Sequence, residues 1–230
     1  MGDVIIDIDK TPHILIGGNT GSGKSVLVQC LLWQAIQQAD VVYVADFKGG
    51  VDFSYVWQEF AYIITEEKKL LVLLNHLADI LEERKRLFKE VDAANITEYR
   101  EKSGDYMQRI VFACDEVAEL LDKTGADKSR KELLAQIEAR LALIARQGRA
   151  FGIHLILATQ RPDANILPGQ IKNNMNIRIC GRADTTLSTI IIGDGRAAEQ
   201  IPHDAQGRFI MEDGTVFQAY YFSDDTISKW

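Results

Sequence analysis

The chain has 230 residues, enough for one large domain that buries a sizeable core without cross-links. Apolar residues make up 47% and charged residues 26% of it, which excludes a disordered chain, a collagen-like chain and a disulfide scaffold. Its 33 acidic and 26 basic residues give a net charge of −7, which argues against a domain that coats nucleic acid through bulk positive charge. A local basic strip remains compatible with that total.

The first residues and the cysteines indicate where the chain works. Residues 1–6 lack the apolar stretch of a signal peptide, and the apolar runs elsewhere are far shorter than the roughly 18–20 residues that cross a bilayer. Cys30, Cys114 and Cys180 each lie in an apolar run, which predicts buried thiols in a reducing compartment. We therefore expect a cytoplasmic domain.

In chain order, short apolar runs alternate with longer segments of helical periodicity. Residues 4–8 alternate between apolar and charged and predict a short strand, possible at a sheet edge, and residues 13–16 predict a buried strand. The pattern then predicts a helix over 25–38, a strand over 41–45, a helix over 66–91, an irregular or short-helical segment over 95–105, a strand over 110–114, a helix over 129–147, a strand over 153–158, a loop with a turn or two of helix over 162–176, and strands over 177–180, 207–211 and 215–222. Such alternation predicts an α/β fold with a mainly parallel central sheet and helices on both faces, whose ligand lies at the carboxyl ends of the strands.

Residues 18–25 match the phosphate-loop pattern G-x-x-x-x-G-K-[ST] between a predicted strand and a predicted helix. Glycines let successive N–H groups point at a phosphate, and the following helix adds its positive end. Lys24 would reach the β and γ phosphates of ATP, and the Ser25 hydroxyl would bind Mg²⁺. The expected nucleotide-binding residues are Gly18, Asn19, Thr20, Gly21, Ser22, Gly23, Lys24, Ser25 and Val26.

Polar residues at the ends of the next strands would complete a hydrolytic site. Asp115 and Glu116 follow the strand 110–114; Asp115 would hold Mg²⁺, directly or through water, and Glu116 would polarise the attacking water. Gln160, after the strand 153–158, would contact the γ-phosphate and that water together, unless it is only a strand-ending amide satisfied by the backbone. Lys48 follows the strand 41–45, and the sequence leaves open whether it is solvated, faces the nucleotide or lies at a subunit boundary.

The motifs resemble the FtsK/SpoIIIE family in order and spacing over about residues 12–222. The matching segments are 17–25, 46–48, 115–116, 152–162 and 171–179, of which the run ending in Ala-Thr-Gln-Arg-Pro is the most specific. The resemblance implies a single RecA-like motor domain over 1–230 that forms hexameric rings and uses ATP and Mg²⁺ to move a polymer through the pore. Members are usually membrane-anchored, and the chromosome pumps also carry a winged-helix domain. Neither segment is expected in this chain, so we expect a membrane-anchored parent or partner protein.

Two segments bear on the branch of the family and on the trans arginine. Residues 46–53 look most like conjugation proteins, lack the proline of chromosome pumps, and share Lys-Gly-Gly with secretion ATPases. Chromosome pumps carry Asp-Ser-Arg shortly after the Arg-Ile strand, where the arginine finger is expected, but residues 185–190 contain no arginine. Arg182 is the candidate for that catalytic role, with Arg178 and Arg196 as alternatives, and each could instead be a surface or core-edge arginine.

The favoured function is a DNA translocase or coupling ATPase in conjugative transfer, which takes double- or single-stranded DNA through the ring. The alternatives are a type VII-like secretion ATPase that moves proteins, a chromosome-segregating DNA pump, and a degenerate nucleotide-binding scaffold, against which the intact Lys24, Asp115 and Glu116 argue. Candidate DNA contacts are Lys123, Lys128, Arg130, Lys131, Arg146, Arg149 and Lys172, although a solvated helix start beside Asp122 and Asp127 is the favoured interpretation of the first four.

Overall fold

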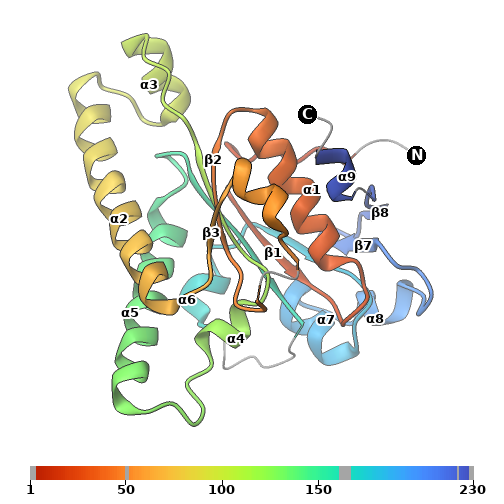
Figure 1. The fold of residues 1–230 in the computed structure, drawn as a ribbon. Helices are drawn as coiled ribbons and strands as arrows, with labels where there is room; N and C mark the ends of the chain where they lie inside the picture. The colour runs from red at the N-terminus through yellow and green to blue at the C-terminus, as the bar shows by residue number, and fades with distance from the viewer. Residues whose placement is uncertain (1–3, 50–51, 161–166, 222, 228–230) are drawn as a thin grey trace.

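The fold is built on one eight-stranded sheet, seen here in a computed structural model that describes residues 4–49, 52–160, 167–221 and 223–227 (Figure 1). The strand order is β3-β2-β4-β5-β1-β6-β7-β8. All neighbours from β3 to β6 pair in parallel, while β7 is antiparallel to both β6 and β8. The strands are β1 (His13–Gly17), β2 (Val41–Ala45), β3 (Tyr62–Ile64), β4 (Ile110–Cys114), β5 (Ile153–Thr159), β6 (Ile177–Cys180), β7 (Arg208–Met211) and β8 (Val216–Gln218).

Helices cover both faces of the sheet (Figure 1). Side chains alternate across a strand, so Leu15 of β1 joins the core under α2, α5 and α7, whereas Ile14 and Ile16 join the core under α1. The helical elements are α1 (Lys24–Gln37), the 3-10 helix η1 (Tyr55–Glu59), α2 (Glu67–Glu90), α3 (Ile96–Ser103), α4 (Val117–Leu121), α5 (Lys128–Gln147), α6 (Gly169–Lys172), α7 (Thr185–Ile192), α8 (Arg196–Gln200) and α9 (Asp224–Ile227). The predicted α/β class, mainly parallel sheet and two helical layers are confirmed.

Two predictions at the ends of the chain need correction. Residues 4–8 form no strand, because the Asp7 carbonyl accepts hydrogen bonds from the Lys10 and Thr11 amides at 3.2 and 2.9 Å and turns the chain. The last strand is shorter than predicted, covering Val216–Gln218 rather than 215–222.

The helix α7 was not predicted, because its sequence Thr-Thr-Leu-Ser-Thr-Ile-Ile-Ile is rich in β-branched residues that favour strands. Its two caps explain the helix. The Asp184 side chain accepts a hydrogen bond from the Leu187 amide at 2.8 Å, and Gly193 ends the helix in the left-handed conformation. Burial of Leu187 and Ile191 against the sheet adds the tertiary contacts that outweigh the local preference.

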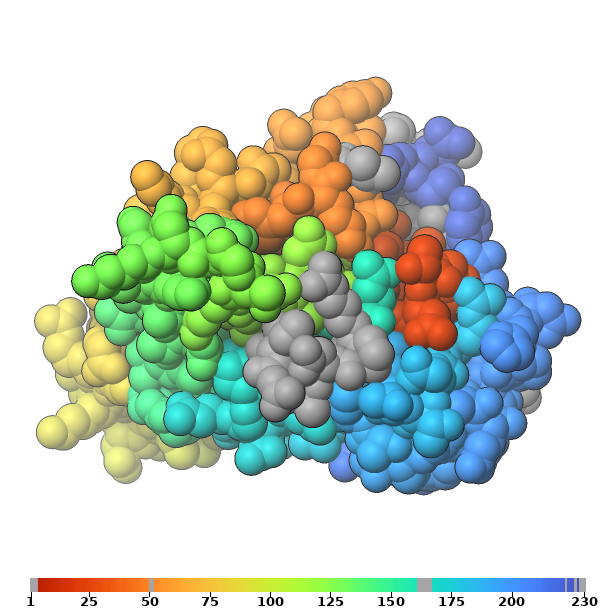
Figure 2. Space-filling model, turned by 90° about the horizontal axis from the view of Figure 1, so that it is seen from below, coloured from red at the N-terminus to blue at the C-terminus, as the bar shows by residue number. Residues whose placement is uncertain are grey.

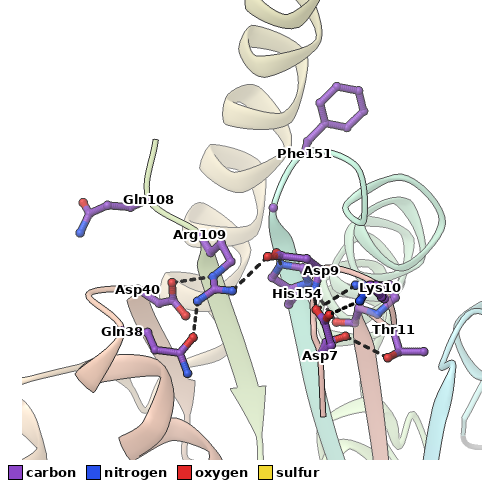
Figure 3. A network of polar contacts seen from close by, with 12 residues as sticks. Asp7, Asp9, Lys10, Thr11, Gln38, Asp40, Gln108, Arg109, Phe151 and His154 are labelled. Carbon is purple, nitrogen blue, oxygen red and sulfur yellow. Dashed lines mark hydrogen bonds and ion pairs between the residues drawn. The ribbon is translucent and has the colours of Figure 1, made fainter. Parts of the chain in front are cut away.

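A network of polar contacts lies at the amino ends of the central strands, at the edge of the sheet opposite the predicted site (Figure 3). Arg109, just before β4, donates to Asp40 at 2.8 Å, Gln38 at 2.6 Å and Asp9 at 3.3 Å. On β5, Nδ1 of His154 donates to the Pro12 carbonyl at 3.1 Å. This network ties the N-terminal segment and the end of α1 to the sheet. No helix in the described part of the chain is long and apolar enough to cross a membrane.

Candidate active site

The predicted phosphate loop joins β1 to α1 at the carboxyl edge of the sheet. Gly23 stands at the N-terminus of α1 with φ 92°, a left-handed conformation that favours glycine. Lys24 begins the helix and is buried, and burial lowers the pKa of its ammonium, while the neighbouring Asp115 and Glu116 carboxylates oppose that shift. In Figure 2 the loop, in red, lies between the cyan end of β5 and the blue C-terminal segments. The strand-loop-helix context that the motif requires is therefore present.

Ser25 and Asp115 meet as expected of a magnesium site. The Ser25 hydroxyl donates to Asp115 Oδ2 at 3.3 Å, and Asp115 Oδ1 is buried without a hydrogen-bond partner among the described residues. A hydroxyl and a carboxylate suit Mg²⁺, which takes oxygen ligands and completes its shell with water and substrate phosphates. Ser25 and Asp115 therefore fit the ion that they are predicted to hold.

Lys48 lies in this site rather than in a solvated loop. Its ammonium donates to Asp115 Oδ2 and, at 3.4 Å, to Asp52 Oδ2. Although burial opposes it, pairing with these two carboxylates raises the pKa of Lys48 to about 12. Lys48 and Ser25 both contact Asp115 Oδ2, so Lys48 lies beside the residues that would hold Mg²⁺. Asp52 joins this cluster without having been predicted; its place four residues after Lys48 was the available signal.

Glu116 is oriented by the end of β5. The Thr159 hydroxyl donates to Glu116 Oε1 at 2.8 Å, and the Gln160 amide donates to Oε2 at 3.0 Å. Burial raises the pKa of Glu116, and these two hydrogen bonds oppose that rise. The Gln160 side chain also accepts a hydrogen bond from the Thr20 hydroxyl at 2.8 Å, which links it to the phosphate loop. Glu116, the Gln160 side chain and the phosphate loop thus lie together. The hydrogen bond by which Thr159 holds Glu116 was not predicted from the sequence.

Arg182 lies beside the phosphate loop of its own chain. It follows β6, and its guanidinium donates to the Thr20 carbonyl at 2.7 Å and to the His203 carbonyl at 2.5 Å. The two alternatives are elsewhere: Arg178 donates to the carbonyls of the α6 region, and Arg196 to Asp194 and Glu212. The predicted trans role of Arg182 is not tested by these contacts, which are all made within one chain.

The candidate basic cluster at the start of α5 is largely paired with acids. Lys123 lies 2.6 Å from Glu138, and Arg130 lies 2.9 Å from Glu67. Lys128 is 4.0 Å from Glu132, at the limit of an ion pair. This pairing favours the interpretation of the cluster as a solvated helix start. Of the other candidates, Arg146 and Arg149 are exposed and Lys172 is half-buried. Gly50, Val51, Arg161 and Pro162, which belong to the recognised motifs, lie outside the described residues.

The model of the FtsK/SpoIIIE family matches residues 2–164. This chain belongs to the FtsK/SpoIIIE family. Among curated relatives, the DNA translocase FtsK of Campylobacter jejuni is 32% identical over 209 residues, which cover 86% of this chain and 21% of that protein. The DNA translocase SftA of Bacillus subtilis is 31% identical over 209 residues, with the same two coverages. The chain thus spans about a fifth of the length of these FtsK/SpoIIIE relatives, and the predicted family resemblance is confirmed.

Two solved structures share the fold. The pCW3 conjugation coupling protein TcpA, solved with ATPγS, is 42% identical with a TM-score of 0.93, over 99% of this chain and 66% of that one. The type VII secretion ATPase EccC of Thermomonospora curvata is 26% identical with a TM-score of 0.70, over 92% of this chain and 26% of that one. The likeness to TcpA extends over nearly every element described above.

Proposed function

We propose that this chain hydrolyses ATP. The observation that carries the proposal is the convergence of the ends of β4 and β5 on the phosphate loop: Ser25 contacts Asp115, and both oxygens of Glu116 are held by the end of β5. The phosphate loop would bind the triphosphate, with Lys24 on the β and γ phosphates. Ser25 and Asp115 would hold Mg²⁺, which would neutralise charge on the phosphates. Glu116 would take a proton from the attacking water, and Gln160 would position that water.

We further propose that hydrolysis drives translocation of DNA, as in the relatives named DNA translocases. Conjugative transfer is the favoured setting, supported by the likeness to TcpA. The working form would be a homo-oligomeric ring, expected to be a hexamer, at the cytosolic face of a membrane with a membrane-anchored parent or partner protein. A ring holds DNA only along its pore, so a net charge of −7 is compatible with this function.

A DNA titration tests the proposal. ATP turnover should rise with added double- or single-stranded DNA, and turnover per chain should rise with protein concentration if neighbouring subunits complete the site. The Lys24→Ala variant serves as the control, because it should lose nucleotide binding and all turnover. Parent turnover that stays flat over the DNA titration would contradict the DNA assignment while leaving the ATPase assignment intact.

A protein-translocating ATPase is the second candidate. It is favoured by the likeness to EccC, a type VII secretion ATPase, and by the acid-paired state of the basic cluster at α5. Turnover that responds to secretion signal peptides but not to DNA would support it. A chromosome-segregating pump would instead respond to DNA, so the genes beside this one would separate that alternative from conjugation.

A further inference from the structure

The phosphate loop rests on the C-terminal third of the chain. The guanidinium of Arg182 donates through Nη2 to the Thr20 carbonyl at 2.7 Å and through Nη1 to the His203 carbonyl at 2.5 Å. The Arg182 carbonyl also accepts a hydrogen bond from the Asn19 amide at 2.7 Å. One residue therefore bridges the loop to the segment between α8 and β7.

A second contact secures the other side of the loop. The Gly207 amide donates to the Ser22 carbonyl at 2.9 Å. A Cβ placed on Gly23 would lie 3.0 Å from Gly207 Cα, so the two backbones approach as closely as glycines allow. We call Arg182 and Gly207 together the loop brace. Figure 2 shows the same contact at the level of segments, with the red loop against the blue C-terminal part.

The brace fixes the direction of two amide groups. In a trans peptide the carbonyl of one residue and the N–H of the next point in opposite directions. Holding the Thr20 carbonyl therefore turns the Gly21 amide away from Arg182, and holding the Ser22 carbonyl turns the Gly23 amide away from Gly207. Among the described residues, neither of these two amides has a hydrogen-bond partner. Such free N–H groups are what an anion-binding loop presents to a phosphate.

We propose that Arg182 acts within its own subunit as a positioning residue that presets the amides of the phosphate loop for nucleotide. This inference rests on the proposed binding of nucleotide at that loop. It assigns Arg182 to the site of its own chain instead of a neighbour's, since both terminal nitrogens are engaged by carbonyls of the same chain. Because the loop amides bind phosphates common to ATP and ADP, Arg182 contributes to the affinity for both.

Nucleotide binding to the monomer provides the first test. Fluorescent mant-ATP and mant-ADP are titrated with Mg²⁺ at protein concentrations at which sedimentation shows a monomer. Losing a charged hydrogen bond should make Arg182→Ala bind both nucleotides about tenfold to a hundredfold more weakly. Arg182→Lys, which keeps the charge but cannot bridge two carbonyls, should be intermediate. Arg100→Ala is the matched control, because Arg100 also donates to a backbone carbonyl but lies at α3.

A kinetic readout separates positioning from a general loss of structure. Arg182 is half-exposed, so the thermal midpoint of Arg182→Ala without nucleotide should stay near that of the parent, while KM for ATP rises and kcat at saturation changes little. Unchanged affinity and KM in both Arg182 variants would overturn the inference. If Lys24→Ala also keeps its affinity, the proposed nucleotide site itself is wrong; if only Lys24→Ala loses it, only the role of Arg182 is wrong.

Mixing variants tests the cis assignment. Arg182→Ala subunits carry an intact Lys24, and Lys24→Ala subunits carry an intact Arg182, so a trans arginine would restore sites in the mixture. We expect ATP turnover of the equimolar mixture to equal the mean of the separate variants. Turnover clearly above that mean would place Arg182 in the site of a neighbouring subunit and overturn the inference.

Discussion

At the scale of single residues, the two adjacent acids of the site, Asp115 and Glu116, have different hydrogen-bonding partners. Asp115 contacts Ser25 and Lys48, so it lies on the metal side of the phosphate loop. Glu116 has both oxygens bound by groups at the end of β5, which fixes the plane of its carboxylate. This difference in partners supports the proposed roles of the two neighbours, Asp115 as a metal ligand and Glu116 as the general base.

Replacing Glu116 tests this division. Glu116→Gln should still bind ATP, because the phosphate loop and Asp115 are intact, but hydrolysis should fall by about 10²–10⁴-fold without a general base. Binding is measured with mant-ATP and hydrolysis by phosphate release. Glu132→Gln, an exposed acid on α5, is the control and should match the parent. Normal turnover in Glu116→Gln would show that another group activates the water.

At the scale of elements, sequence patterns predicted the strands that are formed by continuous, buried apolar runs. The strands 41–45, 110–114 and 177–180 have the predicted bounds, because each is a short apolar run between polar residues. The helix α7 escaped prediction since its caps and tertiary contacts outweigh a strand-like composition. In the site, the motifs at 18–25 and 115–116 were visible, whereas Thr159, Asp52 and the loop brace depend on contacts that only the sheet order creates.

The paired strands β1 and β5 make stability sensitive to acid. His13 and His154 lie there with ring centroids 6.4 Å apart, and burial lowers their pKa values to about 3 and about 4. The fold keeps both neutral, whereas the unfolded chain takes up protons below about pH 6.5, so stability is full above that pH and falls as the pH drops toward 4. The loss at pH 5 should be about 2 kcal/mol per histidine.

Urea unfolding at pH 7.5 and pH 5 measures that loss. The His154→Asn variant keeps a donor for the Pro12 carbonyl and should show a smaller difference between the two pH values than the parent. His76→Gln, at an exposed position of α2, should behave like the parent. A parent whose free energy of unfolding is the same at both pH values would show that the two histidines are not held neutral.

At the scale of the whole molecule, the net charge and the pairing of the basic residues near α5 do not favour attraction of DNA. The net charge is −7, and three of the basic residues near α5 already face carboxylates. We therefore expect an isolated domain to bind a DNA backbone weakly, and strong binding to require several subunits that line one pore. Net charge alone argues against DNA as the substrate. Membership of the FtsK/SpoIIIE family is the reason that DNA is nevertheless the proposed substrate.

Salt dependence measures how many phosphates the lone domain contacts. We expect weak DNA affinity that falls about tenfold to fortyfold between 50 and 200 mM salt, as for two or three neutralised phosphates. Fluorescence anisotropy with a labelled duplex reports the affinity, and mant-ATP binding over the same salt range is the control for the fold. Tight binding that salt does not weaken would contradict this arrangement of charge.

The close approach of Gly23 and Gly207 has a consequence for how the chain tolerates mutation. Gly207 has φ 76°, so any side chain there strains the backbone whose amide donates to the Ser22 carbonyl, and its Cβ would meet the Gln218 side-chain amide at 2.7 Å. In a saturation-mutagenesis library selected for ATP binding, position 207 should accept substitutions as poorly as position 23, although the two positions are 184 apart in the sequence. The sequence requirement for nucleotide binding would then include Gly207 in addition to the motif at residues 18–25.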